Sequence, residues 1–164
     1  MRKITLLMSL AFCFAIVFNA CNSAAPTEEY QAEWLGNTKQ EMIDNIEEQF
    51  QGFSRTMVET GYRYMELYWA GKDQNWEYAE YQREHMEEAL EEGFVRRPDR
   101  ELSSRQFMNV VLPEMEKAIA SKDLSEFLKA FEVMTNQCNT CHQMEQVGFM
   151  TVVTPKIRNT VIHY

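Results

Sequence analysis

The sequence contains little glycine, proline or cysteine, which account for six, four and four of its 164 residues. Glycine and proline are unfavourable in the interior of a helix, whereas Glu, Met, Ala and Leu, which are abundant here, are favourable. This composition therefore indicates a helical domain. The chain also lacks internal repeats and low-complexity segments. Its long uncharged run, from Ile4 to Phe18, is too short to span a bilayer comfortably as a permanent helix.

Basic residues are also scarce, because the chain has 16 Lys and Arg against 25 Asp and Glu. Two of the basic residues, Arg2 and Lys3, lie in the N-terminal leader, so 14 basic residues face 25 acidic ones in the remainder, a net charge of −11. Such a surface argues against nucleic acid as a partner. The acidity either keeps the protein in solution or steers it toward a basic redox partner protein.

The uncharged run and the basic residues before it are typical of a secretory signal peptide, which we place at residues 1–20. The run ends in Ala20-Cys21, which resembles a bacterial lipobox. We therefore expect Cys21 to become the lipidated first residue of the mature chain and to anchor it on the periplasmic side of a bacterial membrane. The alternative is ordinary signal-peptidase cleavage near Ala24 or Ala25, which would leave a soluble periplasmic protein.

Beyond the leader, residues 21–37 are small, polar and acidic, and they predict a tether without fixed structure. Residues 38–164 are enough for one domain with one core. Apolar residues recur there at spacings of three, four and seven, which is the pattern of amphipathic helices. Helices are expected at about 38–70, from Trp76 to about 93, from the Ser103-Ser104 pair to about 119, and at about 124–144.

Glycine and proline mark the expected helix ends. Gly71 is expected to stop the first helix, and Pro113 to kink the third helix or to mark a fresh start. Gly148 breaks the fourth helix, and residues 149–164, rich in Val, Thr and Ile, predict extended chain. Because short turns favour antiparallel neighbours, the predicted fold is all-α, an antiparallel four-helix bundle with an extended C-terminal tail.

Two cysteines remain once the leader is removed and Cys21 is lipidated, namely Cys138 and Cys141. With His142 they form the C-x-x-C-H attachment sequence for one covalent haem c. On a helix, positions i, i+3 and i+4 share a face, so both thiols can reach the vinyl groups of one porphyrin edge as thioethers. His142 can then turn its imidazole under the iron as the proximal ligand.

Other uses of two cysteines at this spacing fit the sequence less well. A thioredoxin-like redox pair requires a βαβ setting, and a zinc site requires a second Cys/His pair. A disulfide between positions i and i+3 of one helix has poor geometry. Export also brings the chain to the compartment where haem is attached to apocytochromes.

A helical bundle with C-x-x-C-H near the end of its last helix resembles cytochrome c prime and its relatives, over roughly residues 38–142. Shorter stretches resemble a group of small exported bacterial c-type haem proteins: residues 67–71, 75–76, 138–143 and 148–149. The tail departs from cytochrome c prime, because 22 residues follow His142. Within the tail, Lys156 and Arg158 either pair with a haem propionate or are solvated.

The motif leaves the sixth iron ligand open. Antiparallel first and fourth helices would place Phe50, Phe53 and Met57 of the first helix across from His142, as the distal wall of the haem. Met57 then either binds iron as the sixth ligand or walls a five-coordinate site, the state that the resemblance to cytochrome c prime implies. Three other side chains are weaker candidates: Met42, His163 and the solvated His85.

The predicted function is electron transfer by an exported single-haem cytochrome. The alternative is a five-coordinate haem protein that binds or senses nitric oxide or carbon monoxide, and a third class is an accessory haem subunit of a larger complex. No acid–base constellation accompanies the motif, so no enzyme activity is predicted. Whether the protein forms a homodimer is left open by the sequence.

Overall fold

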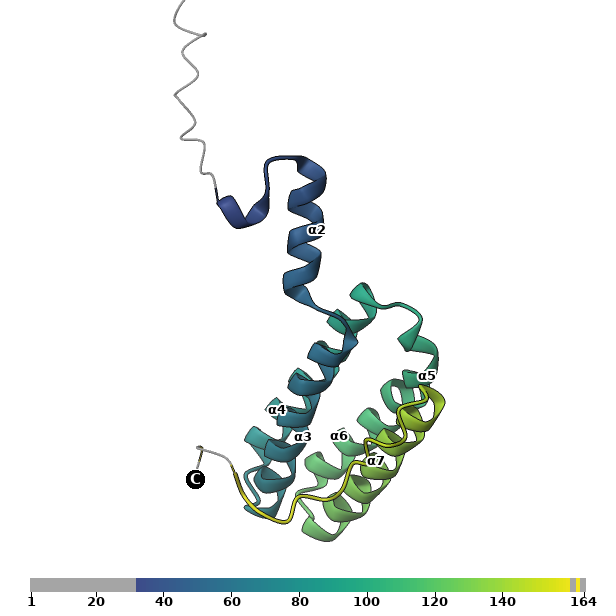
Figure 1. The fold of residues 1–164 in the computed structure, drawn as a ribbon. Helices are drawn as coiled ribbons and strands as arrows, with labels where there is room; N and C mark the ends of the chain where they lie inside the picture. The colour runs from purple at the N-terminus through teal and green to yellow at the C-terminus, as the bar shows by residue number, and fades with distance from the viewer. Residues whose placement is uncertain (1–31, 160–161, 163–164) are drawn as a thin grey trace, which may run out of the picture. The chain divides into compact units, whose positions relative to one another are not determined.

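The structure is a computed structural model that describes residues 32–159 and 162, and this part of the chain contains helices and no strand (Figure 1). The prediction of an all-α protein is therefore confirmed. The chain divides into two compact units, with the boundary between Ile46 and Glu47. The predicted signal peptide, Cys21 and His163 lie outside the described residues. Among the helices that are described, none is both long enough and apolar enough to cross a membrane.

The described part of the first unit holds a 3-10 turn, η1 (Glu33–Leu35), and most of helix α2 (Lys39–Phe50). Glu41 caps the start of α2, because its carboxylate accepts the backbone N–H groups of Asn37 and Thr38 at 2.8 and 3.0 Å. The Thr38 hydroxyl accepts the N–H of Glu41 in return, which completes a capping box. These hydrogen bonds lower the pKa of the Glu41 carboxyl, and the bond from the Asn37 N–H has the largest effect.

The single helix predicted over residues 38–70 is wrong, because α2 and helix α3 (Phe53–Lys72) are separate. Gln51 has a left-handed φ of 60°, through which an α-helix does not continue. Gly52 follows in an extended conformation and precedes the first turn of α3. The apolar spacing runs through this break, so periodicity alone conceals it.

Helix α3 also continues past Gly71, where we expected it to stop. It ends at Lys72, and Gln74, two residues later, has a left-handed φ of 57°. The N–H groups of Gln74 and Asn75 donate to the carbonyls of Gly71 and Ala70 at 3.0 and 2.9 Å, which is a Schellman motif. Gly71 is buried, and its lack of a Cβ lets the ring of Phe127 approach the backbone of α3 closely. A Cβ at this position would overlap that ring.

Helix α4 (Trp76–Arg96) begins where the sequence predicts and ends three residues beyond Gly93. Helix α5 (Arg100–Gln106), the π-helical segment η2 (Phe107–Val111) and helix α6 (Leu112–Ser121) then follow without a break. The Ser103-Ser104 pair lies inside α5 and is buried, so its predicted role as a helix start is wrong. Pro113 lies in the first turn of α6 and cannot donate a backbone hydrogen bond. The helix is therefore irregular here, and η2 occupies the turn before it.

Helix α7 spans Leu124–Met144, the range that the sequence predicts. The Asp123 carboxylate caps it by accepting the N–H groups of Ser125 and Glu126 at 2.7 and 3.0 Å. In the second unit α3, α4, η2, α6 and α7 share one hydrophobic core (Figure 1). Its fully buried members are Leu67, Ala70, Ala79, Met86, Leu112, Met115, Phe127, Phe131 and Met134.

Residues 151–159 form neither helix nor strand, and they pack on α7 and α3. Asn139 of α7 holds this segment by exchanging two hydrogen bonds with the backbone N–H and carbonyl of Val152, at 2.8 and 2.9 Å. Arg158 donates to Asp73 at 2.6 Å and lies over the Trp69 ring at 4.9 Å. Arg158 is thus neither a solvated charge nor free for a propionate, the two roles considered from the sequence.

Candidate functional site

The motif residues Cys138, Cys141 and His142 lie near the end of α7. Gln146 has a left-handed φ of 60°, and the N–H of Val147 donates back to the His142 carbonyl at 2.9 Å. This is again a Schellman ending. The helix therefore stops directly after the motif, and the chain turns back toward it.

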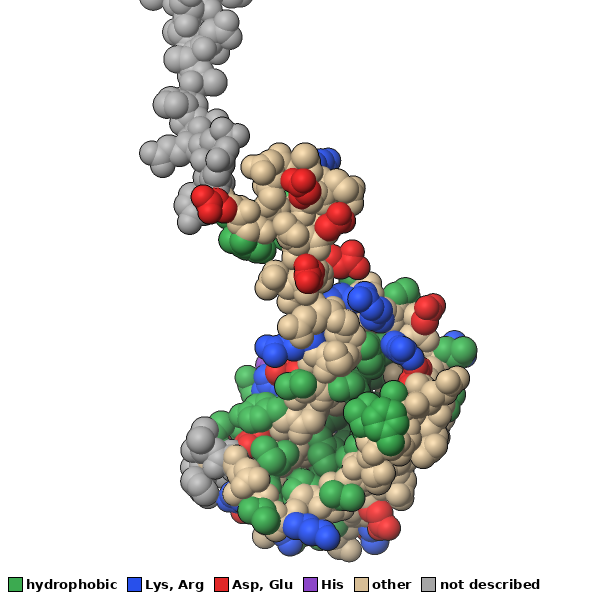
Figure 2. All heavy atoms as spheres, viewed as in Figure 1, with side chains coloured by type: hydrophobic (Ala, Val, Ile, Leu, Met, Phe, Trp, Pro, Cys, Tyr) green, Lys and Arg blue, Asp and Glu red, His purple; other side chains and the backbone are tan. Residues whose placement is uncertain are grey.

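The three motif side chains line one cavity of about 40 Å³. This is below the usual range for small-molecule sites, so a haem would enter only if the surrounding side chains moved apart. Figure 2 shows hydrophobic side chains in a hollow on the face where α3 and α7 lie. The other residues that line the cavity come from α3, α4, α5 and η2: Met57, Thr60, Leu90, Ser104 and Phe107.

Both motif cysteines are free thiols. Burial, together with the neighbouring Cys141, raises the pKa of the Cys138 thiol to about 12, so this thiol is neutral at physiological pH. Redox-active cysteine pairs instead have a lowered pKa, so the thioredoxin-like alternative gains no support. The Cys141 sulfur contacts the hydroxyls of Ser103 and Ser104 at 3.7 and 3.8 Å.

The His142 ring is oriented by the backbone that follows α7. Its Nδ1 lies 2.6 Å from the carbonyl oxygen of Met150. Because a carbonyl can only accept, Nδ1 carries the proton, and Nε2 of the neutral ring keeps its lone pair. Metal-binding histidines are commonly held by such a bond on the second ring nitrogen. His142 is therefore prepared to bind a metal through Nε2.

A zinc site finds no support in the part of the chain that the structure describes. No group of three or more His, Cys, Asp or Glu side chains there is arranged to hold a metal ion. His142 is the one nitrogen ligand that lines the cavity with the two thiols.

Of the three residues predicted for the distal wall, only Met57 lines the cavity that contains the motif. Phe53 is partly buried and stacks on Phe94, with ring centroids 5.8 Å apart. Phe50 ends α2, is 60% exposed and does not line the cavity. The break at Gln51 is the reason, because it removes Phe50 from the face of α3 that carries Met57.

Sequence reasoning missed Thr60 as a member of this site. Thr60 follows Met57 by three positions, so the two side chains share a face of α3. That spacing could have identified it once Met57 was proposed. Leu90 and Phe107 also belong to the hydrophobic core, and nothing in the sequence distinguishes a core residue from one that lines a cavity.

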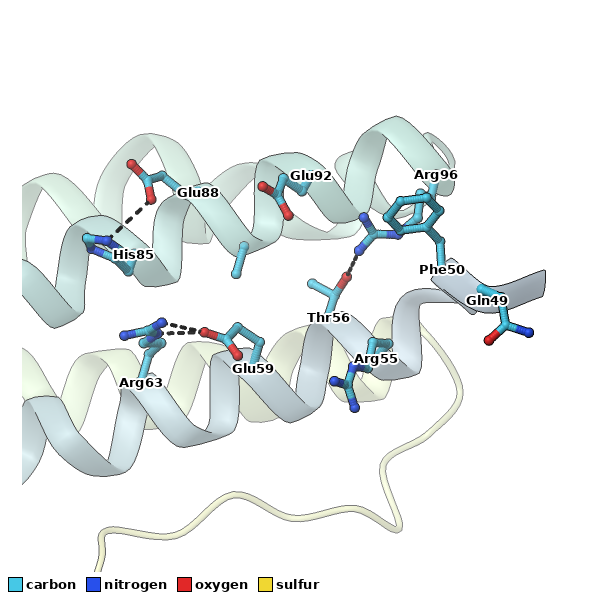
Figure 3. Close-up of a pocket in the computed structure, with 11 residues that line it drawn as sticks. Gln49, Phe50, Arg55, Thr56, Glu59, Arg63, His85, Glu88, Glu92 and Arg96 are labelled. Atoms are coloured by element: carbon cyan, nitrogen blue, oxygen red, sulfur yellow. Dashed lines mark hydrogen bonds and ion pairs between the residues drawn. The ribbon is translucent and has the colours of Figure 1, made fainter. Parts of the chain in front are cut away.

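A second hollow of about 470 Å³ lies between α3 and α4 and contains none of the motif residues (Figure 3). Its lining includes arginines and glutamates in equal number. Arg63 pairs with Glu59 at 2.6 Å, and Arg96 donates to the Thr56 hydroxyl at 3.0 Å. His85 bonds the Tyr81 carbonyl through Nδ1 at 2.8 Å, so it is not the freely solvated side chain expected from the sequence. Because these side chains are paired with one another, they do not indicate a ligand for this hollow.

Comparison of the chain with protein-family models, curated proteins and solved structures found no match. The function is therefore argued from the site alone.

Proposed function

We propose that the protein is an exported c-type cytochrome that carries one covalent haem and transfers electrons. One observation carries the proposal: Cys138, Cys141 and His142 line a single apolar cavity, and His142 is held there with Nε2 available. The proposed architecture is an antiparallel four-helix bundle built from α3, α4, the continuous run from α5 to α6, and α7. Residues 151–159 would be its extended tail.

The residues present fit a haem group. Cys138 and Cys141 are free to form thioethers, and the imidazole of His142 would be the proximal iron ligand. Leu90 and Phe107 would supply apolar walls to the haem. When bound, the haem would supply a one-electron centre at its iron.

Each of these side chains has a separate task. The Met150 carbonyl fixes the tautomer and the orientation of His142, and it would make the ring a stronger donor to a haem iron. Asn139, between the two cysteines, holds the following segment through Val152 and so keeps Met150 in place. Met57 would be the sixth ligand, or it would wall the distal side.

The remaining parts of the proposal concern location and partners. The N-terminal leader would export the chain, and lipidation of Cys21 would anchor it on the periplasmic side of a membrane. The net charge of −11 that remains once the leader is removed favours encounter with a basic redox partner. Detergent partitioning of the native protein against Cys21→Ser tests the anchor, because only the native protein should enter the detergent phase.

Acid-acetone extraction tests the haem attachment. Haem should stay with the native protein, because thioethers do not dissociate, and it should be extractable from the Cys138→Ala/Cys141→Ala variant. Cys21→Ser is the matched control, since it removes a cysteine outside the motif and should retain the haem. Covalent haem in the double variant, or none in the native protein, would overturn the assignment.

Binding of a small gas is the second candidate function, because Thr60, which lines the cavity, has a buried hydroxyl with no partner. The spectrum of the reduced protein separates the two functions. A low-spin spectrum that carbon monoxide does not change supports electron transfer with Met57 as ligand, and Met57→Ala should then make it high-spin. A high-spin spectrum that shifts with carbon monoxide supports gas binding.

A further inference from the structure

The Thr60 hydroxyl is an unexplained group in the described structure. Its oxygen is buried and has no hydrogen-bond partner. Buried polar atoms are rarely left unpaired in native proteins, because each loses its bonds to water without replacement. Of the buried unpaired side-chain atoms in the described residues, Thr60 Oγ1 alone belongs to a residue that lines the cavity of the motif.

Other threonines of this protein pair their hydroxyl with a backbone carbonyl, which Thr60 does not do. In α7, Thr135 and Thr140 donate to the carbonyls four residues earlier, those of Phe131 and Asn136, at 2.8 and 3.0 Å. This is the usual way in which a helical threonine satisfies its hydroxyl. No such bond is present at Thr60, so its hydroxyl has no partner although the residue lines the cavity.

The position of Thr60 decides what it can reach. It lies one turn after Met57 on the same face of α3, whereas the cysteines and His142 come from α7. The hydroxyl of Ser104, which also lines the cavity, is already 3.8 Å from the Cys141 sulfur. Thr60 therefore adds one hydroxyl without a partner, from α3, to a cavity whose proposed proximal ligand comes from α7.

We propose that the Thr60 hydroxyl donates a hydrogen bond to a small diatomic ligand bound on the distal side of the haem. This inference rests on the proposed haem attachment and on gas binding, the second candidate function, and it names the residue that would hold the gas. The outer atom of such a ligand would be the acceptor that α3 does not supply. Because the surroundings are apolar, the bond would be stronger than in water. It would favour ligands that carry partial negative charge.

The test uses the reduced, haem-loaded protein with carbon monoxide as the probe. Thr60→Val removes the hydroxyl and keeps the shape of the side chain, whereas Thr60→Ser keeps the hydroxyl. All forms carry Met57→Leu, a change that conserves volume and prevents a thioether from occupying the distal position. The measurements are the C–O stretching frequency in the infrared and the rate of carbon monoxide release.

A hydrogen bond to the outer atom weakens the C–O bond. We therefore expect the form that retains Thr60 and the Thr60→Ser variant to share a lower stretching frequency than the Thr60→Val variant. The Thr60→Val variant should also release the gas faster. Thr60→Ala is a second hydroxyl-free variant and should behave as Thr60→Val does.

Equal frequencies and release rates in all forms, with the haem still covalently attached, would overturn this inference and leave the proposed function standing. Absence of covalent haem from every form would instead overturn the proposed function and this inference with it.

Discussion

Replacement of Gly71 by alanine tests how α3 packs on α7, the two helices that supply Met57 and the motif. Gly71 is buried, and an added Cβ would lie 2.6 Å from Cδ1 of Phe127 and closer still to two other carbons of its ring. Phe127 is itself fully buried, so its ring has no open space to enter. The ring or one of the helices must therefore move.

Two opposing effects set the size of the change. Alanine is favoured over glycine in a helix by about 1 kcal/mol, whereas an extra methyl group in a packed core costs about 1–3 kcal/mol. The overlap at Gly71 is severe, so we expect the upper part of that range and a net loss of roughly 2 kcal/mol of unfolding free energy. Gly61 is the matched control in the same helix, because a Cβ there meets nothing within 4 Å. Gly61→Ala should raise the unfolding free energy by up to about 1 kcal/mol.

The assay is urea unfolding of the haem-loaded protein, followed by far-ultraviolet circular dichroism. The midpoint should fall for Gly71→Ala and rise for Gly61→Ala, with unchanged slopes. Equal stabilisation by both substitutions would refute the reasoning, because it would mean that Phe127 does not pack on Gly71.

Three further substitutions test other parts of the structure. Asn139→Ala should lower the unfolding free energy by about 2 kcal/mol, because two hydrogen bonds to Val152 are lost at about 1 kcal/mol each, and amide exchange at Val152 should accelerate. Gln146→Gly should raise the melting temperature, because glycine adopts the left-handed φ of 60° without the cost of about 1 kcal/mol that a side chain brings. Burial raises the pKa of Tyr64 to about 12 from its ordinary value of 10.0, so stability should fall as pH rises from 10 to 12. Tyr64→Phe should remove that fall.

Controls and contradicting outcomes follow from the same contacts. Asn136→Ala changes an exposed residue of the same helix and should leave exchange at Val152 unaltered. A lower melting temperature for Gln146→Gly would contradict the assigned helix ending. For Tyr64 the sign is set by proton binding: the folded state holds the phenol proton more tightly, so its stabilising effect is complete below pH 10 and is lost as pH rises through 12. An alkaline transition that persists in Tyr64→Phe would assign it to another group.

The parts of the fold that could be predicted are those in which local signals agree. Helix α7 has an apolar stripe and the Asp123 cap, and its predicted ends match the structure. The break before α3 depends on a left-handed Gln51, and glutamine has no particular preference for that conformation. The role of Gly71 depends on Phe127, which is remote in sequence, so the same glycine indicates a helix end until the tertiary contact is known.

The candidate site also has a part that could be predicted from the sequence and a part that could not. Cys138, Cys141 and His142 follow from their spacing, because one turn of helix sets their common face. The Met150 carbonyl could not be predicted, since any residue type offers a backbone oxygen and only the turn after α7 brings this one to His142. Phe50 was misplaced because its assignment assumed one continuous first helix.

The mass of the denatured protein, isolated from cells that attach haem to apocytochromes, tests the central claim most directly. The account predicts one species heavier by the mass of a single haem than the mature chain with its Cys21 lipid, and a Cys138→Ala/Cys141→Ala variant that lacks this added mass. A native protein without the added mass of a haem, with both thiols free to react with an alkylating reagent, would contradict it.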